Sequence, residues 1–103
     1  MGTSNVRVLG RIYRIARKAM SGKWGLCDNV KGVITVIPNI DEFSEKDVVL
    51  HEVMHAILYQ QNNHKPEDLA LEESFVRPLA TGIIAVLQDN PQLAQWLIAP
   101  IKD

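Results

Sequence analysis

Residues 48–61 read VVLHEVMHAILYQQ and contain neither glycine nor proline. Plotted at about 100° per residue, the aliphatic side chains of this stretch cover one broad arc of a helix. They are Val49, Leu50, Val53, Met54, Ala56 and Ile57. Ser44, followed three residues later by Asp47, is typical of a capping box before such a run. We therefore predict a largely buried helix that is entered near Ser44.

The residues before this helix favour strands. Residues 6–16 alternate as in a strand but also contain an apolar stripe at helical spacing. Their β-branched side chains and Gly10 favour the strand. Residues 23–27 and 33–37 are two β-prone runs on either side of a turn that contains Asn29 and Gly32. This arrangement predicts a hairpin.

The residues after the helix predict two more helices. We expect a turn at residues 62–65 and a second helix from Pro66 to about Gln88, kinked at Pro78. Asn90 and Pro91 then restart a short last helix. The expected inward face of the second helix consists of Leu69, Val76, Leu79, Ala80, Ile83 and Leu87. The prediction is one α+β domain over residues 1–103: a small antiparallel sheet packed on the 48–61 helix, a second antiparallel helix and a short C-terminal helix.

Composition sets outer limits on function. The chain has 103 residues, of which 47% are hydrophobic and 22% charged, as in an ordinary globular domain and unlike a disordered or low-complexity chain. Cys27 is the single cysteine, so an internal disulfide is excluded. The apolar runs fall short of the roughly 20 residues that span a bilayer, and no signal peptide is recognisable. We expect a cytoplasmic protein with no membrane partner.

Charge is distributed unevenly along the chain. Residues 1–31 hold seven basic side chains and one acidic one, whereas residues 32–103 hold four basic and eleven acidic ones. The basic segment could contact a nucleic acid. The sequence pI near 6.3 argues against this, and we expect a solvated surface instead.

Within the 48–61 helix, His51, Glu52 and His55 form an HExxH motif. Two histidines four residues apart project from one side of a helix and can bind one metal ion. Glu52, about 100° round the helix from His51, can then lie beside the ion. Hydrolytic zinc sites divide the tasks between such residues. Neutral imidazoles hold the ion, and a carboxylate takes a proton as water attacks a carbonyl.

A catalytic zinc site usually has a third protein ligand. Gln61 stands six residues after His55, where the metzincin spacing requires histidine, and His64 is expected in a solvated turn. A second helix that returns from Pro66 brings Glu72 and Glu73 level with the histidines. The residues alone leave the choice between Glu72 and Glu73 open.

The run from His51 to Ile57, followed by Glu73 eighteen residues after His55, resembles the gluzincin arrangement of zinc metallopeptidases. It is most similar to small phage and prophage-type proteins related to the ImmA/IrrE group and to minimal gluzincins. The resemblance implies a minimal zincin-like fold with one Zn²⁺ on His51, His55 and Glu73. It further implies that an edge strand, for which residues 24–27 are the candidate, can pair with substrate backbone.

The chain also departs from this family. Larger gluzincins place an aspartate four residues after the ligand glutamate to orient a histidine, and this chain has Arg77 there. That orienting contact is expected from Asp47 or from backbone. Tyr59 and Arg77 are the candidates to stabilise an oxyanion.

The function expected from these residues is zinc-dependent hydrolysis of a peptide bond, with Glu52 as the catalytic general base and then acid. The partner would be a peptide or protein substrate, and the resemblance suggests a regulatory protein. The alternative is a non-catalytic, zinc-stabilised protein-interaction module.

Overall fold

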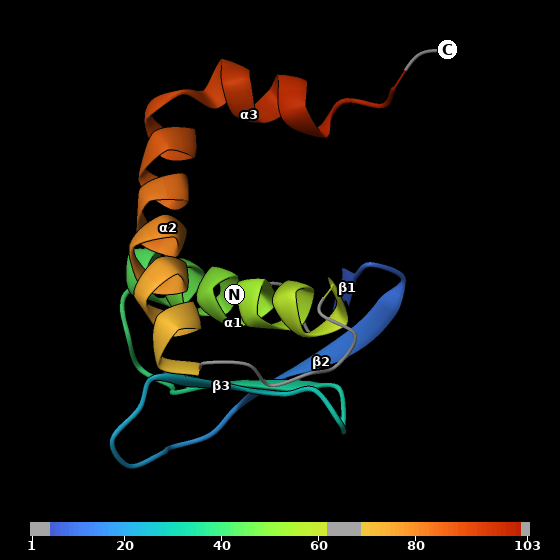
Figure 1. Ribbon diagram of the computed structural model, residues 1–103. Helices are drawn as coiled ribbons and strands as arrows, with labels where there is room; N and C mark the ends of the chain where they lie inside the picture. The colour runs from blue at the N-terminus through green and yellow to red at the C-terminus, as the bar shows by residue number, and fades with distance from the viewer. Residues whose placement is uncertain (1–4, 62–68, 102–103) are drawn as a thin grey trace.

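The computed structural model describes residues 5–61 and 69–101 and confirms the α+β class (Figure 1). Its elements are β1 (Asn5–Val8), β2 (Arg11–Arg17), β3 (Gly25–Asp28), β4 (Val33–Val36), α1 (Glu42–Gln61), α2 (Leu69–Asp89) and α3 (Pro91–Ile98). None of the helices in the described ranges is both long and apolar enough to cross a membrane. The predicted turn at 62–65, which includes His64, and the helix start at Pro66 lie outside the described residues.

The strands form one mixed sheet in the order β1-β2-β4-β3. The predicted hairpin is confirmed, because β3 and β4 pair antiparallel with Leu26 opposite Thr35. The sheet is not wholly antiparallel, since β4 pairs parallel with β2. After β2 the chain crosses to the far edge of the sheet and forms β3, which runs opposite to β2. It then turns back into β4, which lies between β2 and β3 and therefore runs in the same direction as β2. As a result, β3 lies at an edge of the sheet.

Residues 6–16 form two strands, so the prediction of a single strand there was wrong. The backbone φ angles are 50° at Leu9 and 86° at Gly10, and β1 and β2 are antiparallel with Val8 opposite Arg11. Two consecutive positive φ values are typical of the two-residue turns that close hairpins. Leucine rarely adopts this conformation. Its presence therefore did not indicate a turn, and the alternating pattern predicted one continuous strand instead of two.

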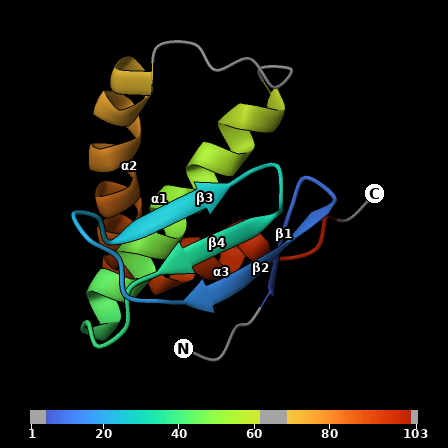
Figure 2. The ribbon, with the colours of Figure 1, turned by 90° about the horizontal axis from the view of Figure 1, so that it is seen from below.

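The core lies between one face of the sheet and α1, and Figure 2 looks onto the opposite, uncovered face of the sheet. Tyr13, Ile34, Val36 and Ala56 are fully buried there. The Tyr13 hydroxyl donates a hydrogen bond to Oδ1 of Asn29 at 2.8 Å. Burial raises the pKa of this hydroxyl above its usual range. The sheet therefore packs directly against α1, the helix that carries the HExxH motif.

Helix α1 begins at Glu42, and Asp41 caps it. The Asp41 carboxylate accepts hydrogen bonds from the backbone N–H and the hydroxyl of Ser44, at 3.0 and 2.6 Å. These bonds lower the pKa of Asp41. The predicted capping box of Ser44 and Asp47 was therefore wrong, because Ser44 already lies in the first turn of the helix. Asp47 instead accepts a hydrogen bond from the Thr81 hydroxyl at 3.0 Å.

Helix α2 packs antiparallel against α1, since Glu72 contacts His55 and Thr81 contacts Asp47. It continues through Pro78 without interruption. From Ala70 onward, its buried side chains are those of Val76, Ala80 and Ile84. Leu79 and Ile83, which were predicted to face inward, are 51% and 39% exposed. The buried face of α2 is therefore rotated relative to the expected one, with Ile84 buried in place of Leu79 and Ile83.

The short helix α3 begins at Pro91, as predicted. Among the described elements it has substantial contacts with α2 only. Figure 1 shows it at the end of α2 farthest from the sheet, turned across the direction of α2. No residue of α3 is buried.

Candidate metal centre

The two histidines of the motif face one another across one turn of α1. The Nε2 atoms of His51 and His55 are 3.2 Å apart, and the ring centroids are 4.9 Å apart. Both side chains are largely shielded, at 18% and 17% exposure. The spacing of four residues thus brings two imidazole nitrogens together, as the sequence predicted.

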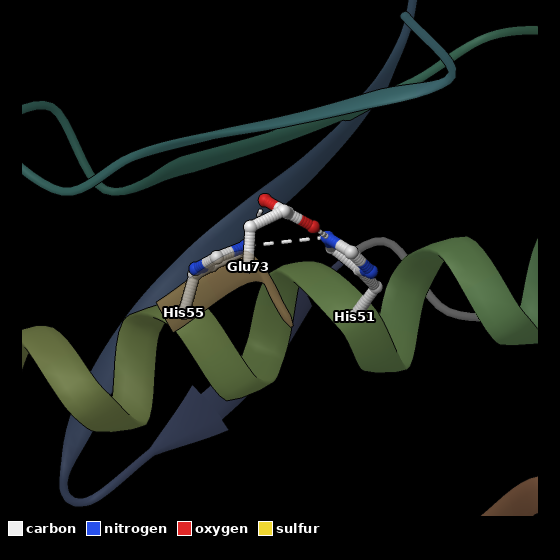
Figure 3. Close-up of side chains that lie close together, drawn as sticks. All are labelled: His51, His55 and Glu73. Carbon is white, nitrogen blue, oxygen red and sulfur yellow. Dashed lines mark hydrogen bonds and ion pairs between the residues drawn. The ribbon is translucent and has the colours of Figure 1, made fainter. Parts of the chain in front are cut away.

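Glu73 reaches the same point from α2 (Figure 3). Its Oε1 lies 2.6 Å from Nε2 of His51, and its Oε2 lies 3.1 Å from Nε2 of His55. One ligand atom from each of these three residues fits within a group whose members are all within 4.8 Å of one another. The structure therefore brings together the three residues that the resemblance assigned to zinc.

Glu72, the other candidate ligand, lies on the opposite side of the His55 ring. Its Oε2 is 2.6 Å from Nδ1 of His55. It therefore occupies the position at the second ring nitrogen where a contact was expected from Asp47 or from backbone. Sequence reasoning missed this role, although the signal was present: two consecutive acidic residues on a helix point about 100° apart and can reach both nitrogens of one ring.

The donor set fits a divalent cation. Two ligands of a tetrahedral zinc ion, each at about 2.0–2.1 Å, are roughly 3.3 Å apart, close to the 3.1 and 3.2 Å separations at His55 Nε2. In addition, Glu73 Oε1 is buried and has no hydrogen-bond partner within the described parts of the chain, despite its proximity to His51. A buried acceptor without a partner is costly. A cation among these atoms would remove that cost.

Burial also sets the protonation of the motif. Desolvation lowers the pKa of His51, although the carboxylate of Glu73 opposes this effect. The neutral imidazole that results is the form that binds metals. Burial raises the pKa of Glu52 to about 7, and His55 opposes this shift. A carboxylate with a pKa near neutrality is suited to both accepting and returning a proton.

Glu52 lies between α1 and the edge strand. Its side chain is buried, and Gly25 of β3 lies directly against it. The motif opens into a cleft of about 650 Å³ between β3 and the two helices. The cleft is lined by residues that include Trp24, Gly25, His51, Glu52, Tyr59, Glu73 and Arg77.

The two candidates for oxyanion stabilisation, Tyr59 and Arg77, both line this cleft. The guanidinium Nη2 of Arg77 lies 3.8 Å from Oε1 of Glu73, and the side chain is 76% exposed. Arg77 is therefore near the cluster of His51, His55 and Glu73 and largely exposed to solvent.

Comparison of the chain with protein-family models, with curated proteins and with solved structures found no match. Functional inference therefore depends on the geometry of the site.

Proposed function

We propose that the protein is a zinc-dependent metallopeptidase. The observation that carries this proposal is the convergence of His51, His55 and Glu73 beside the buried carboxylate of Glu52. Two imidazoles and one carboxylate are a ligand set of catalytic zinc sites, which leave one coordination position open. The buried Oε1 of Glu73, which lies 2.6 Å from Nε2 of His51 but has no hydrogen bond of acceptable geometry within the described residues, supports a cation at this point.

Each residue then has a separate task. His51, His55 and Glu73 hold the ion, which when bound supplies a Lewis acid for carbonyl polarisation and water activation. Glu52 accepts a proton on its carboxylate and returns it to the leaving amine. The cleft along β3 is open to an extended peptide. The outer edge of β3, which pairs with no other described strand, offers backbone groups that could bind it. A regulatory protein as substrate and a cytoplasmic location belong to the same proposal.

The test combines metal content with cleavage. Protein purified without chelators is assayed for bound metal and for hydrolysis of a library of unstructured peptides. Glu52→Gln should keep the zinc and lose cleavage by at least 100-fold, because the general base is gone. Glu42→Gln is the matched control, since Glu42 is an exposed residue of the same helix. Absence of zinc, or full activity of Glu52→Gln, would refute the proposal.

A second candidate function is a zinc-stabilised interaction module without catalysis. The observation that favours it is the exposure of large apolar side chains on α2 and α3, among them Phe75, Trp96 and Ile98 at 60%, 74% and 81%. Exposed apolar patches of this kind mark interaction sites. Zinc binding together with no hydrolysis of any peptide by the wild-type protein would favour this candidate.

A further inference from the structure

Both ring nitrogens of His55 have polar contacts within the described structure. Nδ1 lies 2.6 Å from Oε2 of Glu72, whereas Nε2 faces His51 and Glu73 at 3.2 and 3.1 Å. The His55 and Glu72 side chains are only 17% and 23% exposed. Solvent therefore competes little with the contact between them.

The chemistry of the two groups determines which of them carries the hydrogen in the contact between His55 and Glu72. An ionised carboxylate has lone pairs and no hydrogen to donate, so the short contact requires a hydrogen on Nδ1 of His55. A neutral imidazole carries one such hydrogen, whereas both ring nitrogens face a carboxylate oxygen, Nδ1 at 2.6 Å and Nε2 at 3.1 Å. The shorter contact favours the hydrogen on Nδ1, and Nε2 is then left with a free lone pair. That lone pair points at the place where the Nε2 atom of His51 and Oε2 of Glu73 also converge.

We propose that Glu72 is a positioning residue: its carboxylate holds His55 in the Nδ1–H form, so that Nε2 is presented as a metal ligand. This inference rests on the proposed zinc site for its function, but the tautomer can be measured without metal. It also explains how the site works with Arg77 at the position where larger gluzincins have an orienting aspartate. The carboxylate comes from the residue before the ligand glutamate instead of from the next turn.

The adjacency of Glu72 and Glu73 gives the arrangement its geometry. On α2 the two side chains leave the helix about 100° apart, and α1 presents the His55 ring between them. Glu73 approaches Nε2 and Glu72 approaches Nδ1. The rotation of α2 that places Val76 and Ala80 against α1 therefore fixes the ligand and its positioning residue together.

The first measurement is the tautomer of His55 in the metal-free protein. Long-range ¹H–¹⁵N correlation spectra at pH 8 distinguish a hydrogen on Nδ1 from one on Nε2. We expect the Nδ1–H form in the wild-type protein and a shift towards Nε2–H in Glu72→Ala. The matched control is Glu42→Ala, which removes an exposed carboxylate from α1 and should leave the His55 spectrum unchanged.

The second measurement is zinc affinity, by competition with a chromophoric chelator. Loss of such an orienting partner typically weakens metal binding by roughly 10- to 100-fold, and we expect this loss in Glu72→Ala. Glu72→Gln should fall between the wild type and Glu72→Ala, because its amide oxygen can still accept from Nδ1. Since Gln is nearly isosteric with Glu, this variant also tests the proposal if Glu72→Ala fails to fold. Unchanged affinity in both variants would overturn the positioning role.

The outcomes separate this inference from the proposed function. An Nε2–H tautomer of His55 in the wild-type protein would overturn the inference even if zinc binds and peptides are cleaved. A failure of the wild type to bind zinc would refute the metallopeptidase, whereas the tautomer spectra would still decide whether Glu72 fixes the ring. A changed tautomer in Glu72→Ala with unchanged affinity would reject the link between ring position and metal binding.

Discussion

Gly25 of the edge strand lies so close to Glu52 of α1 that no side chain fits between them. A Cβ atom at position 25 would lie 2.9 Å from Oε2 of Glu52 and 2.6 Å from Cγ1 of Val48. Real Cβ atoms essentially never approach other heavy atoms below 3.0 Å. Glycine at this position therefore allows β3 to cover the carboxylate and keep it buried.

Gly25→Ala should therefore destabilise the protein, by about 1–3 kcal/mol, which is typical of overpacking. The matched control is Gly82→Ala in α2, where an added Cβ meets nothing within 4 Å. Alanine is favoured over glycine inside a helix by roughly 1 kcal/mol, so this variant should be stabilised. Urea unfolding of both variants measures the two effects. Equal effects of the same sign would contradict the close packing of Gly25 against α1.

A second prediction concerns Glu52 and pH in the metal-free protein. Burial raises the pKa of Glu52 in the folded state to about 7, from an ordinary value of 4.5. Between these values the folded state holds more protons at Glu52 than the unfolded state does. The contribution of Glu52 to stability therefore falls as pH rises from about 4.5 to 7.

Glu52→Gln removes this titration. The variant should gain stability relative to the wild type as pH rises, by up to about 3 kcal/mol near pH 8, and the difference should level off above neutrality. Unfolding of both proteins in urea with a chelator at pH 5, 6, 7 and 8 gives the difference directly. The lowered pKa of His51 affects both proteins and largely cancels. A stability difference independent of pH would show that Glu52 does not titrate as inferred.

The sequence predicted what depends on local spacing. His51 and His55 come together because any helix places residues four apart on one side, and the β3–β4 hairpin follows from β-prone runs around a turn. The turn at Leu9 and Gly10 was missed, because leucine gives no signal for a positive φ and the single glycine beside it did not outweigh the alternating pattern. The parallel pairing of β2 with β4 depends on the path of the chain and not on local pattern.

The choice between Glu72 and Glu73 depends on tertiary packing. The two side chains lie on either side of the His55 ring, so a rotation of α2 by part of a turn would exchange their roles. That rotation is set by the burial of Val76, Ala80 and Ile84 against α1. The hydrophobic periodicity placed Leu79 and Ile83 on the same face as Val76 and Ala80. It therefore could not fix the rotation of α2 about its axis to better than the roughly 100° between neighbouring residues.

A third prediction concerns the single cysteine. Burial raises the pKa of the Cys27 thiol to about 12, and the carboxylates of Glu52 and Asp28 add to this effect. The thiol also lies 3.4 Å from Oδ1 of Asn29, to which it can donate. Because the thiolate is the reactive form, its fraction at pH 8.5 should be roughly 1,000-fold below that of an ordinary cysteine.

Cys27 should therefore react slowly with iodoacetamide in the native protein. Alkylation followed by mass spectrometry at pH 8.5 should be at least 100-fold slower than in the same protein unfolded in urea. The unfolded protein serves as the control for intrinsic reactivity. Native and unfolded rates within a factor of a few would mean that the thiol is neither shielded nor shifted.

The last prediction tests which face of the sheet carries the core. Ile34 in β4 is fully buried against α1, whereas Ile12 in β2 is 56% exposed on the uncovered face. Ile34→Ala removes buried methyl groups and leaves a cavity, so it should cost about 2–5 kcal/mol in the free energy of unfolding. Ile12→Ala makes the same chemical change at an exposed position and should cost less than about 1 kcal/mol. Comparable losses in urea unfolding would mean that the Ile12 face is also covered, and the assignment of α1 to one side of the sheet would be incomplete.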